Sequence, residues 1–215
     1  MTSRERIMAA FEHREPDRTP IFEYVLESPI ADILLGRPYC GDKNFPIAVA
    51  ERGWEFAVKQ QAIDRVEIAL ILGHDMLYIP PNPPPPNKHF NTAEVGTKPL
   101  PTDPVEEVMQ RLPMIEETSG SSPSDEIFLI YRLVQEEMEK RNLDLPIMAP
   151  AYAHGIWTDT ALMQTMVLAP ELAQQYFTLI TKKTLKLIER YLELGIKIIG
   201  VGGDFAGNRG PLISP

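Results

Sequence analysis

The chain has 215 residues, of which 44% are apolar and 24% charged, with a net charge of −9 and a pI near 5.0. These values are typical of a folded, water-soluble domain and argue against a nucleic-acid-binding protein, because phosphate backbones are bound by clustered Lys and Arg side chains. No segment reads as a signal peptide or a membrane span, so we expect a cytoplasmic protein without membrane contact. The single cysteine, Cys40, excludes an intramolecular disulfide.

The chain opens with a helix signal followed by a strand signal. Thr2 and Glu5 have the spacing of a capping box, which predicts a short helix that ends before Pro16. The β-branched and aromatic run at residues 21–26 then predicts the first core strand.

A second helix and strand follow. Apolar residues recur at helical spacing over residues 47–72, with Gly53 as a break and Gly73 as the C-terminal cap. The apolar run at residues 76–79 predicts the second strand. The prolines of residues 80–86 exclude a helix there and indicate a stiff surface loop.

The second half repeats this alternation. Asp103 and Pro104 have the pattern of an N-cap followed by proline at the first helical position. Further helices are predicted over residues 125–141, 158–168 and 170–194, strands over residues 146–149 and 196–201, and a loop over residues 202–215.

Strands that alternate with helices predict an α/β fold with a parallel sheet and right-handed crossovers, as a doubly wound sheet or a barrel. Four strands cannot close an eight-stranded barrel, which takes roughly 250 residues. We therefore expect a single, incomplete domain over residues 1–215. Its exposed edge strands predict self-association or pairing with a C-terminal complement.

In such folds the reactive groups follow the C-terminal ends of the strands. Glu23 and Tyr24 belong to the first strand region, as substrate-binding candidates or as loop anchors. Asp75 is a catalytic candidate if the second strand occupies residues 69–72. If that strand begins at Met76, Asp75 lies instead at its entry, where residues stabilise the fold.

The third and fourth strands lead into loops that are richer in functional groups. The loop after the third strand holds His154, a catalytic candidate because imidazole titrates near neutral pH, or alternatively a helix cap. Tyr152 and Trp157 flank it as substrate-binding candidates. After the fourth strand, Asp204 is a candidate acid, base or substrate anchor, and Arg209 is suited to a substrate carboxylate.

Two segments resemble the uroporphyrinogen decarboxylase (URO-D) superfamily. Residues 3–20, SRERIMAAFEHREPDRTP, resemble the start of its members, and residues 194–204 with 210–215 resemble its fourth-strand region. The resemblance implies a (β/α)8 TIM barrel, of which this chain is about the first four β/α units. It also implies two chemistries: decarboxylation of tetrapyrrole acetate arms in porphyrin biosynthesis, and transfer of a methyl group between a corrinoid and a thiol with zinc.

The resemblance favours the methyltransferase-like branch. True decarboxylases carry an arginine-rich segment after the first strand, whereas residues 24–30 hold no arginine and the next is Arg37. The decarboxylase aspartate corresponds to Asp75 in one register. The family's zinc ligands, a His and two Cys, lie in its later half, so we expect no zinc site and no activity from this chain alone. The alternatives are a uroporphyrinogen decarboxylase and a non-catalytic tetrapyrrole-binding or corrinoid-binding fragment.

Overall fold

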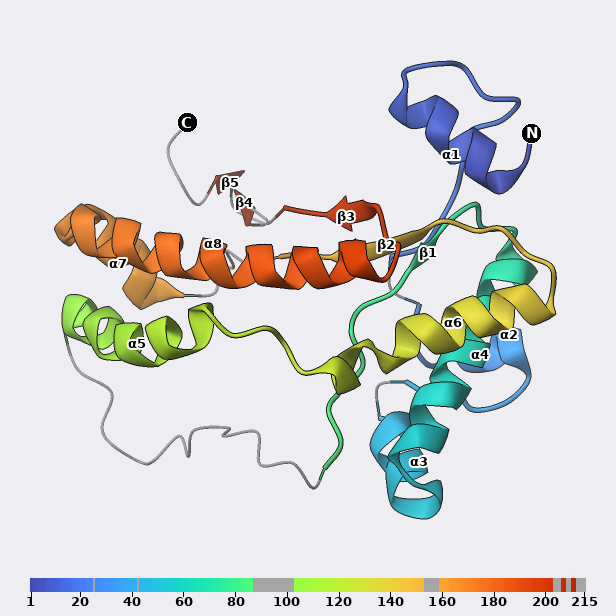
Figure 1. Ribbon diagram of the computed structural model, residues 1–215, viewed down its shortest axis with the longest axis horizontal. Coiled ribbons are helices and arrows are strands. Elements are labelled where there is room, and N and C mark those ends of the chain that lie inside the picture. The colour runs from blue at the N-terminus through green and yellow to red at the C-terminus, as the bar shows by residue number, and fades with distance from the viewer. Residues whose placement is uncertain are drawn as a thin grey trace. The chain divides into compact units, whose positions relative to one another are not determined.

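The computed structural model describes residues 1–24, 26–41, 43–86, 103–152, 159–202, 206–207 and 210–211 (Figure 1). The chain forms two compact units. Unit 1 comprises Met1–Lys88, Ser124–Pro150 and Glu193–Ile199, and unit 2 comprises His89–Pro123, Ala151–Leu192 and Gly200–Pro215.

Unit 1 begins with helix α1 (Ser3–Phe11), and the predicted capping box is confirmed. The Thr2 side chain accepts a hydrogen bond from the Glu5 backbone N–H, and the Glu5 carboxylate accepts one from the Thr2 N–H. These two bonds satisfy backbone donors that a helix start otherwise leaves unpaired. A short helix that the sequence did not predict, α2 (Ile30–Leu35), follows after an irregular segment.

The predicted long helical region is confirmed as two helices, α3 (Asn44–Arg52) and α4 (Trp54–Leu72). Gly53 separates them with φ 92°, and Gly73 ends α4 with φ 67°, a left-handed backbone that glycine adopts without strain. Helix α4 packs against α3 and against α6 (Leu129–Lys140), which a short 3₁₀ helix (Asp125–Phe128) precedes (Figure 1).

Three strands form the sheet, in the order β1 (Leu77–Tyr78), β2 (Ile147–Pro150) and β3 (Ile198–Gly200). Strands β1 and β2 pair in parallel, with Leu77 opposite Ile147 and Tyr78 opposite Met148. These strands confirm the α/β class and three of the predicted strands, because helices separate them along the chain. Ile7 of α1 packs with Met76 and Met148 in the core beside the sheet.

The predicted first strand is wrong for the described part of residues 21–26. Ile21 exchanges two hydrogen bonds with Asp75, through its own N–H and its carbonyl, and the described residues after it form no ladder. The aromatic residues that suggested a strand instead pack on one another, with the Phe22 and Tyr24 ring centroids 6.3 Å apart. Aromatic residues are common in strands because they pack well on a half-buried surface. Here they pack on one another without forming a strand.

Asn82, which is buried, anchors the proline-rich segment to the rest of unit 1. Its side-chain oxygen accepts a hydrogen bond from the Ile130 N–H at the start of α6, and its amide nitrogen donates to the Glu126 carbonyl. The Trp54 indole donates to the Pro83 carbonyl at 2.8 Å. The prolines of residues 80–86 lie outside any helix, as predicted.

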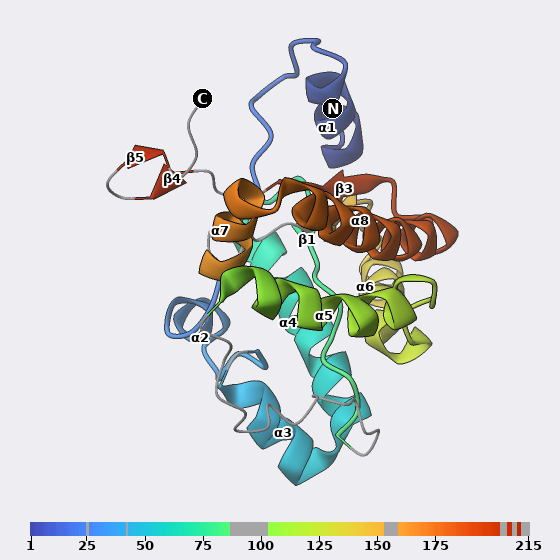
Figure 2. The same cartoon turned by 90° about the vertical axis from the view of Figure 1, so that its left-hand side faces the viewer.

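Unit 2 contains α5 (Pro104–Ser119), α7 (Thr160–Leu168) and nearly all of α8 (Pro170–Glu193), close to their predicted bounds (Figure 2). Asp103 caps α5 through the Val105 N–H, as predicted. Val108 packs with Ala161 and Leu162 in the core between α5 and α7. The predicted terminal loop is wrong at two points, because β4 (Ala206–Gly207) and β5 (Gly210–Pro211) pair as antiparallel strands. Among the described helices, none is long and apolar enough to cross a membrane.

Candidate functional site

The candidate residues divide by whether the structure describes them. Asp75, Glu23, Tyr24 and Tyr152 are described. The remaining candidates lie outside the described residues: His154, Trp157, Asp204 and Arg209.

Asp75 is fully buried at the start of β1 and accepts hydrogen bonds from several elements. Arg6 of α1 donates to it at 2.5 Å and Arg18 at 2.6 Å and 2.9 Å. The Ser3 hydroxyl and the Ile21 N–H complete the set. These donors hold the pKa of the Asp75 carboxyl below its usual range, against the opposing effect of burial.

This geometry answers the question of register that the sequence left open. Residues 69–72 form the last turn of α4, so the alternative with a strand there is wrong and Asp75 lies at the entry of β1. In parallel α/β folds the entry side serves stability, and reactive groups gather at the opposite ends of the strands. We therefore give Asp75 a structural role: it joins the N-terminal segment to the sheet.

A cluster of phenol rings lies where β1 ends. Tyr78 is the last residue of β1, and its ring stacks on Tyr24 with centroids 4.2 Å apart and an interplanar angle of 19°. Burial raises the pKa of both phenols, so they remain protonated donors at neutral pH. Tyr24 is 42% exposed, which leaves part of its ring open to a ligand.

The stacked tyrosines line a small cavity of about 30 Å³. The other polar residues of its described lining are Tyr39, Glu23 from the irregular segment, Arg65 from α4 and His74 from the turn before β1. Burial lowers the pKa of His74, while the nearby Glu23 and Asp75 carboxylates oppose this shift. The imidazole is therefore neutral at pH 7.

Arg37, the first arginine after the predicted first strand, is fully engaged in pairing. Its guanidinium forms ion pairs with Asp64 and with Glu67, both on α4. The Asp64 side chain is buried, so withdrawing the guanidinium would leave a buried carboxylate without its ion-pair partner. Arg37 is thus a structural residue in unit 1, and it is poorly placed to bind a substrate.

Cys40 is buried and structural. Its thiol donates to the Ala57 carbonyl at 3.4 Å, and its backbone N–H donates to Asp64. Burial and the Asp64 charge raise the pKa of the thiol to about 11. Because the thiolate is the nucleophilic form, this cysteine is unreactive at neutral pH.

Tyr152 lies two residues after the end of β2. The neighbouring Ala151 N–H donates to the Gly200 carbonyl at 2.8 Å, and Tyr152 itself is 43% exposed. An aromatic side chain at the carboxyl end of a strand occupies the position where α/β folds bind ligands. The role of Tyr152 in substrate binding stays a prediction.

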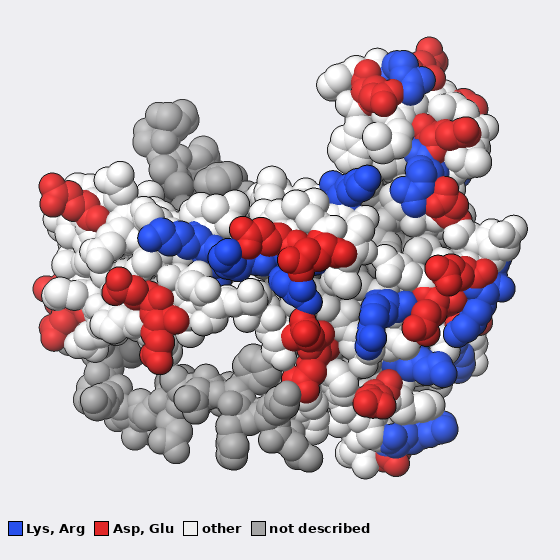
Figure 3. All heavy atoms as spheres, in the orientation of Figure 1, with Lys and Arg blue, Asp and Glu red and all other residues white. Residues whose placement is uncertain are grey.

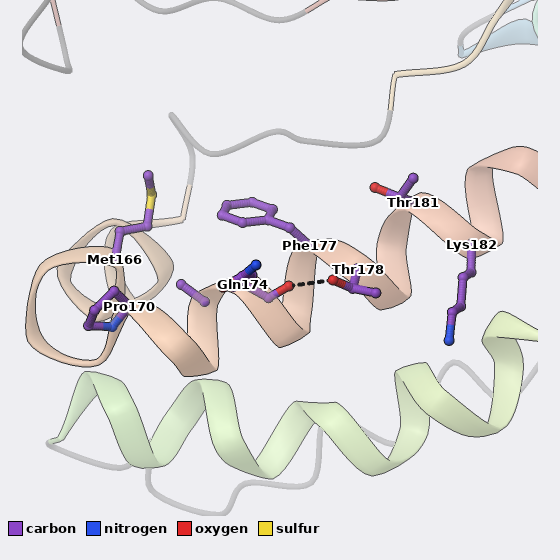
Figure 4. Close-up of a pocket in the computed structure, with 8 residues that line it drawn as sticks. Met166, Pro170, Gln174, Phe177, Thr178, Thr181 and Lys182 are labelled. Atoms are coloured by element: carbon purple, nitrogen blue, oxygen red, sulfur yellow. Dashed lines mark hydrogen bonds between the residues drawn. The ribbon is translucent and has the colours of Figure 1, made fainter.

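Unit 2 also carries an open pocket of about 490 Å³ on α7 and α8 (Figure 4). Met166 and Phe177 supply its apolar surface, and the Thr178 hydroxyl on its wall donates to the Gln174 carbonyl. Lys182 is the single charged residue in the described part of its lining. The pocket contains no carboxylate or imidazole, so its described lining offers no acid and base pair for catalysis.

Charges of both signs are mixed on the face shown in Figure 3, where basic side chains lie among acidic ones over α1, α6 and α8. A phosphate-binding face would instead gather Lys and Arg on one surface.

Within the described ranges, no three His, Cys, Asp or Glu side chains are placed to hold a metal ion. No protein-family model, curated protein or solved structure matches the chain.

Proposed function

We propose that the chain is the N-terminal part of a URO-D superfamily barrel, of the branch that moves a methyl group between a corrinoid and a thiol. The observation that carries this choice is the engagement of Arg37 with Asp64 and Glu67. A uroporphyrinogen decarboxylase needs cations near its first strand to hold a substrate with many carboxylates. Here Arg65 is the single Lys or Arg in the described lining of the cavity beside Tyr24, and Glu23 in the same lining repels a substrate that carries many carboxylates.

The order of the strands in the sheet supports the proposed barrel fold. Strands β1, β2 and β3 are neighbours in chain order, and helices connect them. Chain-order neighbours with helical crossovers are what the first units of a (β/α)8 barrel require. The TIM barrel and its closure by a further segment are part of the proposal, together with the resemblance of residues 3–20 and 194–204.

The chain's own residues would bind the methyl-corrinoid substrate by its flat face. The described candidate for this contact is Tyr152 of unit 2, which exposes a phenol ring after the end of β2. Aromatic rings suit a large, apolar and planar ligand surface. His154 and Asp204 remain the candidates for moving protons.

The experiment is equilibrium dialysis of the 215-residue chain against methylcobalamin, read by the absorbance of the corrinoid. We expect saturable binding that Tyr152→Ala weakens several-fold, because the aromatic contact is lost. The control is Phe11→Ala, which truncates another exposed aromatic residue, on α1. Thermal unfolding of each variant separates a lost contact from a lost fold. Absence of saturable binding by the wild-type chain would overturn the proposal.

A further inference from the structure

The guanidinium of Arg65 lacks the partners that its surroundings demand. Arg65 lies on α4, is partly buried, and lines the cavity beside Tyr24 and Tyr78. One Nη donates to the Tyr78 carbonyl over a long 3.4 Å. Its Nε–H is buried and has no hydrogen-bond partner. Arg65 forms no ion pair with any described residue.

The carboxylates closest in sequence are occupied. Asp64 and Glu67 flank Arg65 on α4, and both pair with Arg37. Glu23 lines the same cavity, but it is exposed and makes no ion pair with Arg65. A partly buried cation with an unpaired N–H is costly, so such groups normally bind an acceptor.

The cavity limits the size of that acceptor. Its volume of about 30 Å³ exceeds the roughly 10–15 Å³ that a single water molecule needs in a cavity, but it is too small for a whole ligand. A single planar end group fits this space, with the remainder of a ligand extending past the exposed part of Tyr24. The Tyr24 and Tyr78 phenols stay protonated and the His74 imidazole is neutral, so these side chains keep hydrogen-bond donors and add no negative charge that would repel an anion.

We propose that this cavity binds one carboxylate group of a small ligand, held by the guanidinium of Arg65. Guanidinium edges match the planar geometry of a carboxylate, and charge-assisted hydrogen bonds are the stronger kind. A second carboxylate on the same ligand would meet Glu23, so the site selects a monocarboxylate. This site is independent of methyl transfer and would stand if corrinoid binding failed.

Sodium formate is the probe, titrated into the full chain at constant ionic strength against sodium chloride. The readout is the Nε–H cross-peak of Arg65 in ¹⁵N NMR spectra, assigned from the peak lost in Arg65→Gln. We expect formate to shift this peak saturably and chloride to leave it nearly unmoved. The melting temperature of the wild-type chain should rise with formate concentration over the same range in which the peak shifts.

Variants test whether the guanidinium is responsible. Arg65→Gln should raise the formate concentration that gives half of the stabilisation at least about tenfold, since one charge-assisted interaction is lost. Arg132→Gln, which removes an exposed arginine of α6, is the matched control and should behave as wild type. Arg65→Lys keeps the charge without the fork and should bind more weakly than wild type, which covers the case of an unfolded glutamine variant. An unmoved Arg65 peak, or an equal response to chloride, would overturn the site.

Discussion

Asp75→Asn removes the buried negative charge that joins the N-terminal segment to the sheet. The replacement is nearly isosteric, so it leaves no cavity, yet it turns one acceptor oxygen into a donor. That new donor faces the guanidinium of Arg18 or the N–H of Ile21, both of which already donate to this position. We therefore expect the loss to be mainly electrostatic and local to the start of β1.

The magnitude follows from the exposure of the partners. Breaking a buried ion pair from one side costs about 3–5 kcal/mol. The lower end applies to Asp75, because the Arg18 side chain is 46% exposed and returns to water, and Arg6 keeps Asp17 as a partner. A loss of about 3 kcal/mol in a chain of this length lowers the melting temperature by about 6–12 °C.

Urea and thermal unfolding, followed by far-UV circular dichroism, measure this loss. The matched control is Asp144→Asn, because the Arg4–Asp144 ion pair is as short but exposed on both sides. We expect the control to cost less than about 1 kcal/mol. If Asp75→Asn were as stable as Asp144→Asn, the structural role that we give to Asp75 would be wrong.

Three further predictions follow from single groups. Because the pKa of Asp75 is lowered in the folded protein, its carboxylate contributes stability above the ordinary carboxyl pKa near 4, and this stability is lost as the pH falls through the folded value. Asp75→Asn lacks this titrating group, so its unfolding free energy should fall less steeply with decreasing pH than that of the wild-type chain. A plot of unfolding free energy against pH for the two proteins checks this, and parallel curves would contradict it. Asn82→Ala leaves the Ile130 N–H unpaired inside the protein and should cost about 1–3 kcal/mol in urea unfolding, against no measurable change for an exposed residue such as Gln174→Ala. Cys40 should resist iodoacetamide at pH 7.5 in the native chain and react in urea, as followed by mass spectrometry; rapid native labelling would refute its burial and raised pKa.

Local signals in the sequence predicted the elements well. The Thr2 capping box, the break at Gly53 and the cap at Gly73 each depend on a few neighbouring residues, and the structure has all three. The strands at residues 76–79 and 146–149 were also found, since compact apolar runs between helices have few alternatives.

Long-range pairing set the limit of prediction. Asp75 accepts hydrogen bonds from Arg6 and Arg18, which lie 69 and 57 residues away in the sequence, and no local sequence pattern predicts such pairs. The same holds for Arg37 with Asp64, which decides that the arginine is structural. The predicted first strand failed because aromatic residues suited to a ladder pack here on one another and on Tyr78. Arg65 was missed because its significance lies in the absence of a partner.

The most direct test of the proposed branch is a competition for the wild-type chain between methylcobalamin and uroporphyrinogen, measured by equilibrium dialysis under anaerobic conditions. We predict that methylcobalamin binds saturably and that an excess of uroporphyrinogen does not displace it, because Arg37 is paired and Glu23 repels carboxylates. Tight binding of uroporphyrinogen, with release of its acetate carboxylates as carbon dioxide, would contradict the account and identify a decarboxylase.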